Sequence, residues 1–283
     1  MIHLTPDVQN LIDRALAEDQ TFNDPTTGSI IPPDLKGLGV IRSKANGVLA
    51  GVEVSLAVFR RVDPQLRTEA LLPDGVALSP GVAVARVEGS AASILRAERI
   101  ALNFLQRMSG IATDTSRYVK VVEGFKARIV DTRKTVPGLR YLDKYAVRAG
   151  GGANHRLNLA DGILIKDNHI AALRSQGLSL GDTVKLALER APFTVRVEVE
   201  VTNLEELQEA LEVGAHIIML DNMSLADMRR AVEIVNGRAI IEASGGINLE
   251  TVRAVAETGV DIISVGSLTH SVRALDMSLD LEF

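Results

Sequence analysis

Polar and charged residues follow several short apolar, β-branched runs in the second half of this 283-residue sequence. Arginine binds planar carboxylates through two parallel hydrogen bonds, whereas lysine acts as a point charge on phosphate oxygens. The sequence therefore predicts a site for a small molecule that carries several anionic groups. The residues concerned are Thr132, Arg133, Lys134, His155, Arg156, Lys166, Glu200, Asp221, Ser244, Gly245, Gly246, Gly266 and Ser267.

The charge distribution points the same way. The chain as a whole is acidic, with a net charge of −5, which argues against general nucleic-acid binding. Residues 128–156 are nevertheless basic, with Asp131 and Asp143 as the only acids among many lysines and arginines. Such a segment can steer a small polyanion to a local site. A solvated charged face remains the alternative interpretation.

Two glycine turns suggest phosphate binding. Ser244-Gly245-Gly246 leaves one apolar run, and Gly266-Ser267 leaves the next. Glycine lets the backbone approach an anion and present N–H groups to it. Either turn alone could be a simple tight turn, but two on successive runs favour a phosphate monoester.

Glu200 and Asp221 are acidic residues among these cations. They are suited to holding ribose hydroxyls and a hydrated Mg²⁺, which prefers one or two carboxylates plus phosphate oxygens. An internal network of salt bridges is the alternative. The histidines are too scattered for a zinc signature, and no HExxH motif is present.

Strand and helix patterns alternate in the second half. Apolar runs of strand length occupy residues 127–131, 162–166, 194–201, 216–221, 238–243 and 261–265. Helical patterns lie between most of them, which predicts a parallel sheet covered by helices. In the run 194–201 the valines alternate with Arg196, Glu198 and Glu200, and a doubly wound sheet does not easily bury three charges on one face. We therefore expect a barrel with polar residues inside it.

The first half predicts a mixed α/β domain. Thr5 and Pro6 begin a helical pattern, residues 39–44, 47–52, 67–72 and 82–88 are expected strands, and residues 93–109 form a helical pattern that we expect to end at Gly110. We expect an N-terminal domain over residues 1–112 and a barrel over 113–268. The tail, residues 269–283, is expected to pack against the N-terminal domain.

The absence of cysteine excludes disulfides, thiolate metal sites and a cysteine nucleophile. Neither a signal peptide nor a membrane span is evident. We expect a soluble, cytoplasmic protein.

Longer motifs resemble the quinolinate phosphoribosyltransferases, also called nicotinate-nucleotide pyrophosphorylases (carboxylating). They are residues 96–103, 105–113, 131–140, 144, 150–156, 165–169, 197–200, 219–222, 242–246 and 265–266. The resemblance covers nearly the whole chain. It implies an incomplete (β/α) barrel domain with an N-terminal α/β sandwich domain, Mg²⁺ as cofactor, and a homodimer with shared active sites or a higher oligomer. The implied reaction joins quinolinate to phosphoribosyl pyrophosphate, with loss of CO₂ and pyrophosphate, in NAD biosynthesis.

The resemblance also implies roles for individual residues. Arg99 would reach the partner's site, and Thr132, Arg133, His155, Arg156 and Lys166 would bind substrate, mainly the pyridine dicarboxylate. Lys134 would meet the dicarboxylate or the pyrophosphate, and with Lys166, Glu200 and Asp221 it would be catalytic. The ribose and Mg²⁺ would be held by Glu200 and Asp221. The 5′-phosphate would be bound by Ser244, Gly245, Gly246, Val265, Gly266, Ser267 and His270.

Three alternatives stay open. The first is a related phosphoribosyltransferase, either the paralogue associated with molybdate-transport operons or a nicotinate-specific enzyme. The second is a barrel aldolase in which Lys166 forms a Schiff base. The third is a phosphometabolite-binding regulator without catalysis, which would have no need of the acidic pair.

Overall fold

The structure, a computed structural model, describes residues 2–283. These residues form two compact units. The first comprises residues 2–116, Val136–Gly151 and Thr269–Phe283, and the second comprises Arg117–Thr135 and Gly152–Leu268. We expected a single boundary near residue 112, but residues 113–116 and Val136–Gly151 belong to the first unit.

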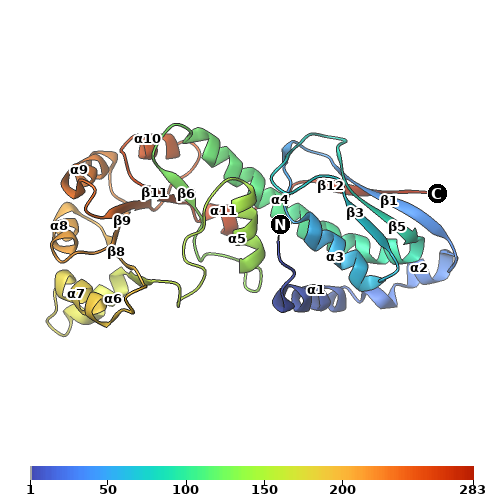
Figure 1. Cartoon of the computed structure of the whole chain (residues 1–283), viewed down its shortest axis with the longest axis horizontal. Coiled ribbons are helices and arrows are strands. Elements are labelled where there is room, and N and C mark those ends of the chain that lie inside the picture. Colours follow the sequence, from blue (N-terminus) through green and yellow to red (C-terminus); the bar gives the residue numbers. More distant parts are fainter. Residues whose placement is uncertain (1) are drawn as a thin grey trace. The chain divides into compact units, whose positions relative to one another are not determined.

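The first unit is built on a four-stranded antiparallel sheet with the strand order β12-β1-β5-β3 (Figure 1). Its strands are β1 (Lys36–Ser43), β3 (Arg67–Ala70), β5 (Ala83–Ser90) and β12 (Met277–Glu282), and a small separate ladder joins β2 (Gly47–Val48) to β4 (Ala77–Leu78). The helices are α1 (Pro6–Glu18), α2 (Pro25–Ile30), α3 (Val52–Val62), α4 (Ala91–Val121), which leaves this unit after Ser116, and α5 (Arg140–Ala149), with a 3₁₀ turn η1 (Thr21–Asn23).

The start of α1 follows the expected capping signal. Thr5 is the N-cap, and its hydroxyl accepts from the main-chain N–H of Val8 at 3.4 Å. Val8, Ile12 and Leu16 are buried on one face of the helix. The prediction of a helix from Thr5 and Pro6 is confirmed.

Two local predictions were wrong. Residues 47–52 form a strand only at Gly47–Val48, because Gly51 adopts φ +89° and starts α3 instead. Gly110 does not end α4, which continues to Val121. A Cβ at Gly110 would lie 2.2 Å from the main-chain oxygen of Arg273, so this glycine serves a close packing contact rather than a helix end.

Specific contacts explain why Val136–Gly151 joins the first unit. Arg107 on α4 donates two hydrogen bonds to the Asp143 carboxylate of α5, at 3.0 and 2.8 Å, and Asp143 is fully buried. The Tyr145 hydroxyl donates to Asp74 at 2.6 Å. A charge-assisted, two-point pair at a buried carboxylate is a strong local attachment.

The tail is attached to the same unit through β12, which pairs antiparallel with β1. The Gln106 side chain donates to the main-chain carbonyl of Met277, the first residue of β12, at 2.9 Å. Strand β12 thus completes the sheet at the free edge of β1.

The second unit contains six parallel strands in the order β6-β11-β10-β9-β8-β7 (Figure 1). Each strand pairs with the next in sequence from β7 to β11, and β11 pairs with β6, the first. This is the cyclic order of a barrel, left open between β6 and β7, which no ladder joins within residues 2–283. The six predicted strands are confirmed. They are β6 (Arg128–Val130), β7 (Ile163–Ile165), β8 (Val197–Val201), β9 (Ile217–Asp221), β10 (Ile240–Ser244) and β11 (Ile262–Ser264).

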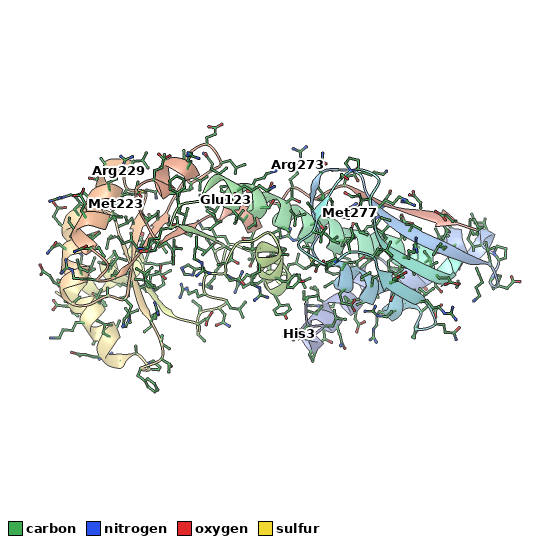
Figure 2. All side chains as sticks on the ribbon, turned by 45° about the horizontal axis from the view of Figure 1, so that its top comes forward. His3, Glu123, Met223, Arg229, Arg273 and Met277 are labelled. Carbon is green, nitrogen blue, oxygen red and sulfur yellow. The ribbon has the colours of Figure 1, made fainter. Side chains whose placement is uncertain are left out.

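Helices follow the strands of this unit as expected for strand–helix repeats. They are α6 (Asp167–Arg174), α7 (Leu180–Arg190), α8 (Leu204–Glu212), α9 (Leu225–Val235), α10 (Val252–Ala256) and α11 (Ser267–His270), the last of which ends in the first unit. Arg229 on α9 is exposed (Figure 2). Helices long and apolar enough to span a bilayer are absent from residues 2–283.

Strand β8 shows the predicted alternation from Val197 onward, whereas Arg196, which was expected on the same face as the glutamates, precedes the strand and is exposed. Val197, Val199 and Val201 are completely buried, and Glu198 and Glu200 occupy the alternate positions on the other face. The polar face of the strand therefore belongs to the inside of the open barrel.

The packing at Gly110 gives a stability test. We expect Gly110→Ala to lower the free energy of unfolding by about 1–3 kcal/mol, the usual cost of overpacking, because the Arg273 backbone must move. Gly28→Ala is the matched control, since a Cβ there meets only Arg96 at 4.0 Å. Equal thermal unfolding midpoints for the two variants would contradict the close-contact interpretation.

Candidate active site

A cavity of about 630 Å³ opens at the carboxyl ends of the parallel strands. This is the end at which barrel proteins place their functional groups, and the volume is in the range of small-molecule sites. Every residue that lines it belongs to the second unit. They are Thr132, Arg133, Lys134, His155, Arg156, Leu164, Lys166, Glu200, Met219, Asp221, Asn222, Glu242, Ser244, Gly245, Gly246 and Ser264.

The structure brings most of the predicted site residues together in this cavity, from Thr132 to Gly246 along the chain. Val265, Gly266 and Ser267 follow β11 but do not line it. Arg99 and His270 belong to the first unit, where both are exposed.

Sequence reasoning missed five lining residues: Leu164, Met219, Asn222, Glu242 and Ser264. Glu242 could have been found, because it stands two positions before Ser244 on β10 and alternate residues of a strand share a face. By the same rule Leu164 precedes Lys166, and Met219 precedes Asp221.

Two arginines lie close together in the cavity. Burial and the charge of Arg133 lower the pKa of Arg156, while the charge of Glu198 opposes this effect. Arg156 is further fixed by donating to the main-chain oxygen of Gly162 at 3.2 Å. Two neighbouring guanidinium groups repel one another, so a ligand with two carboxylates is well suited to neutralise both.

An acidic pair lies on β8 and β9. Burial raises the pKa of Glu200; Lys166, whose Nζ is 3.9 Å from Glu200, opposes this, and the charge of Asp221 adds to it. The two carboxylates therefore face the same space closely enough to repel. This arrangement favours a cation or ribose hydroxyls between them.

The glycine turn after β10 depends on a close approach. Gly245 has φ +96°, and a Cβ there would lie 2.2 Å from the side-chain oxygen of Asn222. Asn222 itself has φ +54°, and its amide donates to Asp221 at 3.0 Å. Gly245 thus allows the loops after β9 and β10 to pack together beside the acidic pair.

Asp131 anchors the loop that carries His155 and Arg156. Its carboxylate is fully buried and accepts from the Asn154 amide at 2.6 Å and from the His155 main-chain N–H at 2.9 Å. Main-chain bonds join Ala153 to Ile129 and Asp131, so the loop lies along β6.

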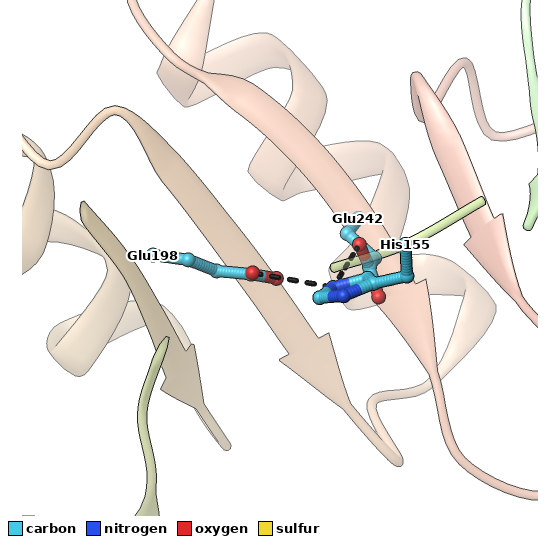
Figure 3. A group of neighbouring side chains, drawn as sticks. All are labelled: His155, Glu198 and Glu242. Atoms are coloured by element: carbon cyan, nitrogen blue, oxygen red, sulfur yellow. Dashed lines mark ion pairs between the residues drawn. The ribbon is translucent and has the colours of Figure 1, made fainter. Parts of the chain in front are cut away.

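His155 lies between two buried glutamates (Figure 3). Its Nε2 is 3.2 Å from Glu198 on β8 and 3.4 Å from Glu242 on β10. Its Nδ1 accepts from the main-chain N–H of Arg156 at 2.8 Å. Both ring nitrogens are therefore engaged within the protein.

The protonation states of His155, Glu198 and Glu242 depend on one another. Burial disfavours a charged His155, but hydrogen bonds with Glu198 and Glu242 and their charges outweigh it and raise its pKa to about 10. Burial also raises the pKa of Glu198, which His155 opposes. An imidazolium would point an Nδ1–H at the Arg156 N–H, so we favour a neutral ring with Nε2–H and place the further proton on the carboxylates. The raised pKa then belongs to the group as a whole.

Comparison with known proteins identifies the family. The family model described as the quinolinate phosphoribosyl transferase C-terminal domain matches residues 111–280, and that of the N-terminal domain matches residues 24–109. The chain belongs to the quinolinate phosphoribosyl transferase family.

Relatives within this family match over nearly their full length. A probable nicotinate-nucleotide pyrophosphorylase [carboxylating] of Bacillus subtilis is 41% identical and covers 97% of this chain and 93% of its own. Quinolinate phosphoribosyltransferase [decarboxylating] 2, mitochondrial, of Nicotiana glauca is 42% identical over 99% of this chain and 84% of its own. The crystal structure of NadC from Streptococcus pyogenes has a TM-score of 0.93 at 41% identity, covering 99% of this chain and 98% of its own.

The Asp131 anchor gives a second stability test. An asparagine at this position would turn an amide donor toward the Asn154 or His155 N–H. We expect Asp131→Asn to lower the free energy of unfolding by about 1.5–3 kcal/mol, as for hydrogen bonds to a charged group. Asp161→Asn, in the same loop region but exposed, should have little effect. Chemical denaturation of both variants checks this, and equal stabilities would argue against the anchor.

Proposed function

We propose that the protein transfers the phosphoribosyl group of phosphoribosyl pyrophosphate to quinolinate. The products are nicotinate mononucleotide, CO₂ and pyrophosphate, and the reaction belongs to NAD biosynthesis. The observation that carries the proposal is the Arg133–Arg156 pair in one cavity with two lysines, an acidic pair and a glycine turn. Family membership supports the same reaction.

Each set of cavity residues is assigned to one anionic group of the two substrates. Arg133 and Arg156, with Thr132 beside them, would bind the pyridine dicarboxylate. Lys134 and Lys166 would meet the dicarboxylate or the leaving pyrophosphate. The Ser244-Gly245-Gly246 turn would present main-chain N–H groups to the 5′-phosphate. Val265, Gly266, Ser267 and His270 do not line the cavity. Their assignment to the 5′-phosphate comes from the family resemblance and, for Gly266 and Ser267, also from the second glycine turn of the sequence.

The reaction follows from these positions. The pyridine nitrogen forms a bond to C1 of the ribose while the bond from C1 to the pyrophosphate oxygen breaks, through an oxocarbenium-like state. Glu200 and Asp221 place negative charge near the developing cation, and the lysines stabilise the leaving group. The bond from C2 to the carboxylate then breaks and CO₂ leaves, the positive charge of the ring nitrogen stabilises the electron pair left on C2, and a proton binds to that carbon. Positioning and electrostatics suffice, without a covalent enzyme intermediate.

The acidic pair also fits Mg²⁺. Glu200 and Asp221 repel each other across the cavity, which is the donor set that a hydrated Mg²⁺ prefers. When bound, the ion would supply positive charge to the pyrophosphate oxygens. Glu200 and Asp221 would hold it mainly through water.

Among the alternatives, the aldolase is not favoured. The Lys166 side chain is 45% exposed, whereas a Schiff-base lysine is commonly activated by burial. A nicotinate-specific enzyme would need only one carboxylate partner, and the cavity holds two adjacent arginines.

The decisive assay combines the protein with quinolinate, phosphoribosyl pyrophosphate and Mg²⁺, and follows the products by ultraviolet absorbance and mass spectrometry. We expect nicotinate mononucleotide and CO₂ from quinolinate and no product from nicotinate. Product from nicotinate only would transfer the substrate assignment to the nicotinate-specific alternative, and no product from either would contradict the proposed reaction.

We further propose that the protein is cytoplasmic. We also propose that it forms a homodimer in which Arg99 enters the partner's site. Arg99 is exposed on α4, which leaves it available to a second subunit. We expect Arg99→Ala to raise the KM for quinolinate about tenfold or more, the equivalent of one charge-assisted contact. The KM for phosphoribosyl pyrophosphate should change much less. Steady-state kinetics with each substrate varied in turn makes the comparison.

Arg229→Ala, on the exposed face of α9, is the matched control and should leave both KM values unchanged. Equal effects of Arg99→Ala on the two KM values would contradict the assigned role. Mixed dimers of Arg99→Ala and Lys166→Ala subunits should recover part of the activity, and no recovery would count against shared sites.

A further inference from the structure

His155 lines the cavity, yet its ring nitrogens are turned to the protein. Nε2 faces Glu198 and Glu242, and Nδ1 accepts the Arg156 N–H. A ligand carboxylate needs a ring N–H to bind, and the arrangement offers its Nε2–H to the two glutamates. His155 is therefore poorly placed to bind substrate directly.

The same contacts connect the barrel strands to Arg156. Glu198 and Glu242 are on strands β8 and β10, and their side chains are 6% and 2% exposed. One oxygen of each, Oε1, is buried without a hydrogen-bond partner within residues 2–283. The contact with His155 is thus important for holding both carboxylates in place.

Both the main chain and the side chain of Arg156 are held by hydrogen bonds. Its main-chain N–H donates to His155, and its guanidinium donates to the Gly162 carbonyl at 3.2 Å. Asp131 accepts a hydrogen bond from the main-chain N–H of His155 and fixes the residue before Arg156. A chain of hydrogen bonds therefore runs from two barrel strands through the imidazole to the backbone of Arg156.

We propose that His155 is a positioning residue that fixes Arg156 against Glu198 and Glu242, and that it does not itself bind the dicarboxylate. The inference rests on the proposed function for the identity of the ligand. In this arrangement Arg156 and Arg133 make the contacts with the substrate, and His155 determines where Arg156 stands.

The three side chains could also surround a metal ion, since their ligand atoms lie within 4.8 Å of one another. The hydrogen-bonded arrangement is favoured because the Arg156 charge acts on Glu198, with the Arg133 charge close to Arg156. A further cation in this place would be repelled by both guanidinium groups.

Two substitutions test the roles of the two ring nitrogens of His155 separately. In His155→Asn the amide stands where Nδ1 was, and in His155→Gln it reaches the place of Nε2. We expect both to raise the KM for quinolinate about tenfold, because each breaks one half of the connection. The KM for phosphoribosyl pyrophosphate and kcat should change less. A normal KM for quinolinate in either variant would overturn the proposal, since one nitrogen alone would then suffice.

Glu198→Leu tests the connection with His155 intact. Glu198 does not line the cavity of the proposed site. If His155 acts by positioning, this variant also raises the KM for quinolinate. If His155 binds substrate directly, release of Nε2 leaves that KM unchanged or lowers it. A stoichiometric metal ion present in the wild-type protein and lost in Glu198→Leu would equally overturn the proposal.

His216→Asn is the matched control, because this exposed histidine accepts the Val197 N–H through Nδ1 at 2.9 Å, at the start of β9. Wild type and His216→Asn should turn over quinolinate alike. If neither does, the proposed function fails, while hydrogen exchange of the Arg156 amide without substrate still tests the inference. That amide should exchange faster in His155→Gln than in wild type or His155→Asn, and equal rates would overturn the arrangement.

If His155→Asn does not fold, its combination with Glu198→Gln and Glu242→Gln removes the two carboxylates that it leaves without their partner. We expect this triple variant to fold and to keep the raised KM for quinolinate. A normal KM in the folded triple variant would show that Arg156 needs no support from His155.

Discussion

Three carboxylates are enclosed in the second unit, and each must be paired. Asp131, Glu198 and Glu242 are 0%, 5% and 1% exposed. Removing an ion from water costs several kcal/mol unless hydrogen bonds and opposite charges compensate. The segment from Asn154 to His155 supplies the donors for all three. The path of this loop, and with it the place of Arg156, therefore follows from the need to satisfy buried acids.

One of these buried acids, Glu198, also helps the site to hold a cation. Burial lowers the pKa of Arg156, and the charge of Arg133 lowers it further. The charge of Glu198 works in the opposite sense and helps to keep Arg156 ionised. The cavity is thus lined by more basic than acidic residues, and the carboxylate of Glu198 is buried beside it. An anionic ligand completes this arrangement rather than opposing it.

Much of this could be predicted from the sequence. The six parallel strands and the inward glutamates of β8 follow from local patterns, because alternation along a strand needs no tertiary information. Most of the polar lining residues between Thr132 and Gly246 were predicted from the ends of the expected strands. These signals are local, and they do not depend on which distant segments come into contact.

The errors concern contacts between distant segments. The sequence pattern predicts a helix end at Gly110, but this glycine packs against the backbone of Arg273. The attachment of α5 to the first unit depends on Asp143 meeting Arg107. The contacts of His155 Nε2 depend on two strands, β8 and β10, that are distant from it in sequence. Such pairings cannot be read from spacing.

The pairing of β12 with β1 bears on how the chain folds as it is synthesised. β1 lies near residue 40, and its partner β12 follows the entire second unit. Domains generally fold in turn as they leave the ribosome, but here the sheet that begins first is completed only after the barrel strands have emerged. During that interval β1 has an open edge, which is the part of a sheet most prone to pair with other chains. The second unit is thus the earlier of the two that can finish folding, although it comes later in the sequence.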